Sequence, residues 1–166
     1  MSLILNKAIF QNSLATLPLA TYQAGETVIA DGSRTGRLLI LSKGTVVIVK
    51  EGTEIAKVAE RGAVFGELSV LLDQPHAADV RALETAEFHV ADATTLLTQN
   101  PIAVLYVATM LAHRLNGANQ ALIQLKHQLS TGEPPNVVAK TVSKMEELLI
   151  ADASLIYAGY PHDPYA

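Results

Sequence analysis

The sequence contains no cysteine and no tryptophan among its 166 residues, and only 17% of the residues are charged. Without cysteine, disulfides, thiolate zinc sites, iron–sulfur clusters and a cysteine nucleophile are all excluded. Hydrophobic residues make up 49% of the chain and the mean hydropathy is +0.27. Such a composition supplies enough apolar surface to offset the entropy lost when the chain becomes ordered. The sequence therefore predicts one compact domain with a small appendage.

Positive charge is also scarce. Lys and Arg number 12 against 16 Asp and Glu, which gives a net charge of −4 and a pI of about 5.7. This balance argues against an electrostatic contact with DNA or anionic lipid. The longest apolar run, residues 102–112, is well short of the ~20 residues that cross a bilayer. The first ten residues carry no signal-peptide core. We expect a cytoplasmic protein that contacts neither nucleic acid nor membrane.

Short β-type runs separated by glycine-containing turns dominate residues 23–90. The runs are 27–30, 38–41, 45–50, 55–59, 78–82 and 87–90. Regular short strands with such turns favour an antiparallel sandwich or barrel. Residues 66–73 interrupt the pattern and predict one or two helical turns. A short helix is expected over residues 7–17, ended by Pro18.

After Ala91 the pattern becomes helical. Asp92 is a suitable N-cap for a short helix that ends near Asn100, and Pro101 suits the first position of a long helix to about Leu129. Apolar residues in this helix follow an unbroken 4-3 spacing: Val104, Ala108, Leu111, Leu115, Ala118, Leu122, Leu125 and Leu129. This set, the seam, indicates a coiled-coil contact. A helix packed only on its own barrel would show a wider stripe, so the seam favours a homodimer through residues 102–129.

The end of the chain is a separate unit in this interpretation. Residues 130–135 (STGEPP) form a linker, residues 136–151 an amphipathic helix, and the remaining tail is irregular. The apolar side of that helix carries Val138, Val142, Met145 and Leu149. The predicted domain thus covers residues 1–131, with a long helix over about 101–129, and residues 132–166 hold the linker, short helix and tail. We expect residues from 136 onward to be dispensable for folding of the barrel.

Residues 62–82 (GAVFGELSVLLDQPHAADVRA) carry the sharpest motif. A glycine before a glutamate, a helical turn and a proline-led loop together predict an anion-binding loop, because free N–H groups would point at a phosphate. Gly66 would let the backbone approach closely, and Glu67 could accept a hydrogen bond from a hydroxyl. Taken singly, Gly66 is equally a turn glycine and Glu67 a solvated surface acid.

The same stretch resembles the phosphate-binding cassette of the cyclic nucleotide-binding domain family. The matching residues are Phe65, Gly66, Glu67, Leu68, Ser69, Leu71, Pro75, Ala78 and Val80. The resemblance extends over roughly residues 14–129. It implies a mainly β fold with α: a double-stranded β-helix, jelly-roll-like barrel flanked by an N-terminal helix and a long C-terminal dimerisation helix. It also implies cAMP or cGMP as a ligand and no tightly bound cofactor.

Carried over residue by residue, the resemblance implies a set of ligand contacts. They are Phe65, Gly66, Glu67, Leu68, Ser69, His76, Ala77, Ala78 and, from the long helix, Asn119. Glu67 would hold the ribose hydroxyl, and backbone amides of the cassette would meet the cyclic phosphate. His76 stands where the family carries a phosphate-binding arginine. Histidine lacks the permanent charge and the planar fork of arginine.

Three functions follow as alternatives. The first is a dimeric cyclic-nucleotide sensor or regulatory domain that signals through its long helix. The second is a degenerate domain that acts as an interaction or dimerisation module without nucleotide. The third, a DNA-binding activator, is rejected because residues 130–166 have room for one helix and hold two lysines against five acidic residues. No catalytic residues are predicted, since no nucleophile elbow or P-loop is present, and the histidines lack a metal-ligand spacing.

Overall fold

The computed structural model describes residues 7–132 and 134–150. The strands of this part are β1 (Leu19–Tyr22), β2 (Thr27–Ile29), β3 (Arg37–Lys43), β4 (Val46–Lys50), β5 (Thr53–Val58), β6 (Val64–Phe65), β7 (Asp79–Ala82) and β8 (Ala86–Asp92). Its helices are α1 (Lys7–Leu14), α2 (Glu67–Leu71), α3 (Ala93–Gln99), α4 (Pro101–Thr131) and α5 (Pro135–Ile150). The six predicted strand runs and the short helical turns after residue 66 are all present, whereas β1 and β6 had no counterpart in the sequence analysis.

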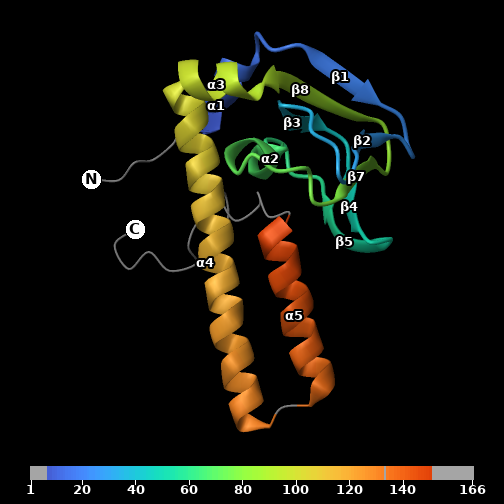
Figure 1. The fold of residues 1–166 in the computed structure, drawn as a ribbon, viewed down its shortest axis with the longest axis vertical. Coiled ribbons are helices and arrows are strands. Elements are labelled where there is room, and N and C mark those ends of the chain that lie inside the picture. The colour runs from blue at the N-terminus through green and yellow to red at the C-terminus, as the bar shows by residue number, and fades with distance from the viewer. Residues whose placement is uncertain (1–6, 133, 151–166) are drawn as a thin grey trace.

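Two antiparallel four-stranded sheets face each other and form the barrel (Figure 1). The strand orders are β1-β8-β3-β6 and β2-β7-β4-β5. One core fills the space between the sheets and includes Leu41, Ile48 and Phe88. The arrangement confirms the expected mainly β barrel with flanking helices.

A second core joins the outer face of β3 to the helices. Leu39 and Leu41 of β3 belong to the first core, while the alternating Leu38 and Ile40 belong to the second. Period-two alternation of a strand places its neighbours on opposite faces, so β3 is buried on both sides. In the second core, the rings of Phe10 in α1 and Tyr106 in α4 stack with centroids 3.7 Å apart. This contact fixes α1 and α4 against the same side of the barrel.

The predicted helix starts of α3 and α4 are confirmed by their caps. The Asp92 carboxylate accepts a hydrogen bond from the Thr95 amide at 2.8 Å, and the Asn100 side chain accepts one from the Ala103 amide at 3.1 Å. Pro101 occupies the first turn of α4, where its missing N–H costs nothing. Within the described ranges no single helix is both long and apolar enough to span a bilayer. The pair α3 and α4 passes that test only together, across a bend of 105°.

Beyond the barrel, α5 turns back beside α4 and runs antiparallel to it toward β5 (Figure 1). The connection is shorter than predicted: α4 continues to Thr131 and α5 begins at Pro135, because Gly132 ends α4 in a left-handed conformation with φ 72°. The expected linker over 130–135 is therefore wrong at both ends. Thr141 in α5 donates a buried hydrogen bond to the Gln128 side-chain oxygen of α4 at 2.8 Å. The Leu149 side chain and the predicted irregular tail lie outside the described part.

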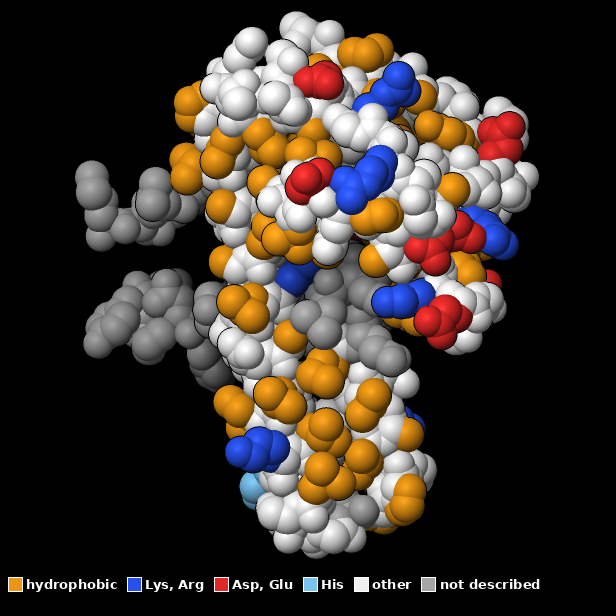
Figure 2. Space-filling view, in the orientation of Figure 1, with side chains coloured by type: hydrophobic (Ala, Val, Ile, Leu, Met, Phe, Trp, Pro, Cys, Tyr) orange, Lys and Arg blue, Asp and Glu red, His pale blue; other side chains and the backbone are white. Residues whose placement is uncertain are grey.

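The face of α4 that is buried within the chain lies next to the seam rather than on it. Buried α4 residues are Ala103, Tyr106, Val107, Met110, Arg114, Gly117, Ala118, Ala121 and Gln128. Of the seam, Ala118 is buried, but Leu115, Leu122 and Leu129 are 60%, 47% and 63% exposed. Figure 2 shows hydrophobic side chains gathered over the lower half of the helical pair. The seam thus remains open to a partner after the chain has folded.

Candidate functional site

A cavity of about 140 Å³ lies between two walls. One wall is formed by the strands β2, β4 and β7, and the other by the segment that runs from β6 through α2 to Ala78. Its walls consist of Ile29, Ile48, Lys50, Val64, Phe65, Gly66, Glu67, Leu68, Ser69, Gln74, Pro75, His76, Ala77, Ala78 and Val80. Eight of the nine ligand contacts implied by the resemblance line this cavity, all of them from the cassette. The remaining one, Asn119, is exposed on α4 and does not line it.

Gly66 sits where the chain turns from β6 into α2. Its φ is 94°, a left-handed conformation that only glycine adopts at low cost. A Cβ at this position would lie 2.5 Å from the Arg37 carbonyl oxygen and 3.4 Å from Cε1 of His76. The first turn of α2 has no side-chain cap, so its amide donors are available to a ligand. Both the turn and the close approach therefore require glycine here.

Glu67 is buried, and it pairs with an arginine that the sequence analysis left without a role. Nη1 of Arg114 in α4 donates to Oε1 of Glu67 at 2.5 Å, and the two side chains are only 6% and 5% exposed. Nη2 of Arg114 also lies 3.4 Å from the Val64 carbonyl oxygen. The alternative of Glu67 as a solvated surface acid is wrong. Its second carboxylate oxygen retains the capacity to accept a hydrogen bond from a ligand hydroxyl.

His76, which lies later in the cassette sequence than Glu67, is also buried. Its Nε2 lies 3.1 Å from Oγ1 of Thr35, and its backbone is held by the loop before β3 through bonds to Ser33 and Gly32. Burial lowers the pKa of His76 below its ordinary value of 6.5, and the negative charge of Glu67 opposes that shift without reversing it. Burial therefore favours the neutral imidazole, which can act as a hydrogen-bonding group toward Thr35.

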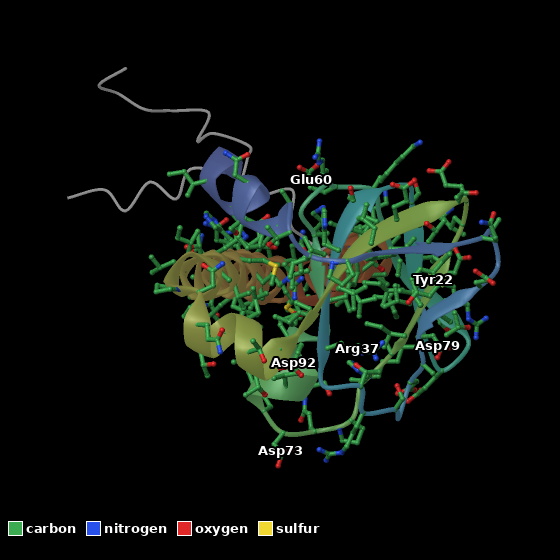
Figure 3. The ribbon with its side chains drawn as sticks, turned by 90° about the horizontal axis from the view of Figure 1, so that it is seen from above. Tyr22, Arg37, Glu60, Asp73, Asp79 and Asp92 are labelled. Carbon is green, nitrogen blue, oxygen red and sulfur yellow. The ribbon has the colours of Figure 1, made fainter. Side chains whose placement is uncertain are left out.

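The other polar cassette groups keep the loop in shape or face the cavity. The Ser69 hydroxyl donates to the Gln74 carbonyl oxygen at 2.6 Å and so closes the loop after α2. Within this loop, Asp73 pairs with Arg34 at 2.9 Å and points away from the barrel at the edge of the molecule (Figure 3). Within the described ranges, no three His, Asp or Glu residues are grouped closely enough to hold a metal ion. The site is suited to binding an organic ligand with polar groups at one end.

Residues 19–98 match the family model described as "Cyclic nucleotide-binding domain". The chain is 37% identical over 70 residues to a cAMP-dependent protein kinase regulatory subunit of Mycosarcoma maydis, a match over 40% of this chain and 13% of that protein. It is 30% identical over 78 residues to a cGMP-dependent protein kinase of Eimeria tenella, over 47% of this chain and 7% of that protein. This chain therefore corresponds to only a small part of either relative.

Among solved structures, the catabolite activator protein of Thermus thermophilus superposes with a TM-score of 0.57 at 20% sequence identity. The superposition covers 93% of this chain and 83% of that one. At this level of identity the likeness establishes a shared fold. It extends beyond the barrel, because 93% of the chain includes the long helix.

Proposed function

Since the chain contains a cyclic nucleotide-binding domain over residues 19–98, we propose that it binds a cyclic nucleotide, cAMP or cGMP, in the cavity of the cassette. One observation carries this proposal: the consecutive residues Gly66 and Glu67 and the later His76 line a single cavity with largely apolar walls. Apolar walls with a few placed polar groups are typical of small-molecule sites. The two relatives named for cAMP and cGMP support the same ligand class.

In this proposal the domain is regulatory and has no catalytic step. The cassette senses the nucleotide, and α4 transmits the signal because its Arg114 holds Glu67 from the other side of the cavity wall. We further propose a cytoplasmic location with no direct contact to nucleic acid or membrane, consistent with the net charge of −4.

Titration calorimetry of the purified chain with cAMP, cGMP and 5′-AMP tests the proposal. We expect at least one cyclic nucleotide to bind more tightly than the acyclic 5′-AMP. Ala77, which is exposed and lines the cavity, allows a matched pair of variants. Ala77→Leu should block the cavity, whereas Ala24→Val, at an exposed turn away from it, should bind as the wild type does. Absence of binding by the wild type to both cyclic nucleotides would contradict the proposal.

The exposed seam favours a second function, self-association through α4. Three of its leucines, Leu115, Leu122 and Leu129, are about half exposed or more in the folded chain, and burying them against a second copy would remove that area from water. The wild type should therefore sediment as a dimer and Leu115→Glu/Leu122→Glu as a folded monomer. If the dimer forms and calorimetry detects no nucleotide, the domain is an interaction module; a dimeric double variant would place the interface elsewhere.

A further inference from the structure

Lys50 is the last residue of β4 and reaches the same cavity from the barrel side. Ile48, two residues earlier, is in the barrel core, and side chains two residues apart in a strand share a face. The register of β4 with β7 pairs Ile48 with Val80 and Val49 with Asp79. Continued by one residue, it places Lys50 opposite Ala78, directly after the His76–Ala77 segment. The lysine side chain is therefore aimed along the cavity wall formed by the end of the cassette, in agreement with its place in the lining.

The charges around the cavity leave this lysine uncompensated. Lys50 and Glu67 are the charged residues in the lining, and Glu67 is already neutralised by Arg114. Burial lowers the pKa of His76, which favours its neutral form at pH 7. Among the described residues, no carboxylate lies within ion-pair distance of the Lys50 ammonium group, whereas Arg81 near the cavity is paired with Asp79 at 2.6 Å. Lys50, which is exposed at the end of β4, is thus the unpaired charged residue of the cavity lining.

We infer that Lys50 is the residue that binds the negative charge of the ligand, and that the cavity selects a monoanion. The inference rests on the proposed function and names a binding residue for it. A cyclic phosphodiester carries a single negative charge, which one lysine neutralises. A phosphomonoester carries roughly 1.5 to 2 negative charges at pH 7, because its second pKa is about 6. It would leave charge uncompensated between apolar walls, where an unpaired charge is costly.

Calorimetry with cAMP and cGMP on four forms of the full chain tests this inference. Lys50→Met removes the charge and keeps the apolar stem, while Lys50→Arg retains the charge. Lys57→Met is the matched control, because Lys57 is an exposed lysine of the neighbouring β5 that does not line the cavity. Both methionine variants lower the net charge of the chain by one, so a difference between them reports the cavity alone.

We expect Lys50→Met to weaken binding by about tenfold to a hundredfold, the range for a charge-assisted hydrogen bond. Lys50→Arg should stay within about threefold of the wild type and Lys57→Met should be unchanged. Binding by the wild type should weaken with added NaCl, and this dependence should be smaller in Lys50→Met. Melting curves of all four forms verify that each is folded. Equal affinities of Lys50→Met and the wild type would overturn the role of Lys50 alone, whereas a wild type that binds neither nucleotide would overturn the proposed function and this inference together.

Discussion

Replacing Arg114 by methionine should strongly destabilise the fold, because it would leave the Glu67 carboxylate buried without its counter-charge. The two side chains are 6% and 5% exposed and their closest atoms are 2.5 Å apart. Removal of one partner from such a buried pair costs about 3–5 kcal/mol. Replacing both partners removes the isolated charge, so Glu67→Met/Arg114→Met should recover a large part of the lost free energy of unfolding.

Urea unfolding followed by circular dichroism measures this effect. With a dependence on urea of about 1–3 kcal/mol per molar, the loss in Arg114→Met corresponds to a midpoint at least ~1 M lower than in the wild type. Lys57→Met, at an exposed position, should stay within about 0.5 kcal/mol. An Arg114→Met midpoint equal to that of the wild type would refute the reasoning, since it would mean that water reaches Glu67 as soon as the guanidinium is gone.

Three further predictions concern the cassette and α5. Gly66→Ala should lower Tm more than Gly25→Ala. Both glycines have a positive φ, 94° and 88°, but only at Gly66 would the new Cβ meet backbone, 2.5 Å from the Arg37 carbonyl oxygen. Equal losses of Tm in the two variants would refute the close approach. Burial lowers the pKa of His76, so below pH ~6.5 the unfolded chain binds more protons than the folded one, and stability should fall as the pH drops through that value. Thermal melts should show a smaller fall of Tm with decreasing pH in His76→Gln. An identical dependence of Tm on pH in the two proteins would contradict this. Truncation after Ser130 should leave the barrel folded but expose the face of α4 on which Gln128 lies. Sedimentation should therefore show stronger self-association of the truncated chain than of the full chain. An unchanged sedimentation profile would contradict this prediction.

The parts of the molecule that could be predicted from sequence are those whose geometry is encoded locally. Asp92, Asn100 and Pro101 define helix starts through bonds to residues within one turn, and the structure has the helices where they indicate. The cassette residues from Phe65 to Ala78 are close in the chain as well, so a contiguous motif was enough to bring them to one cavity. Their contacts with a ligand stay predictions.

Residues that reach the cavity from distant elements carried no such signal. Arg114 is 47 positions from Glu67 in the sequence. No local pattern around Arg114 indicates that its side chain pairs with a carboxylate of the cassette. Lys50 is identified only by the register of β4 with β7, which no local pattern specifies. The strand β6 has two residues, too few for any periodicity to be visible. Asn119 differs from the cassette residues: the resemblance implies it as a ligand contact, but it is exposed on α4 and does not line the cavity, so this contact stays a prediction.

The hydrogen bond between Thr141 and Gln128 fixes the register in which α5 docks on α4. Sliding α5 by one helical turn would move Thr141 by about 5.4 Å, far beyond hydrogen-bonding range, and would leave the Gln128 oxygen buried without a donor. Shifted registers along α4 are therefore higher in free energy than the docked one. The same hydrogen bond thereby sets which residues of α5 meet β5.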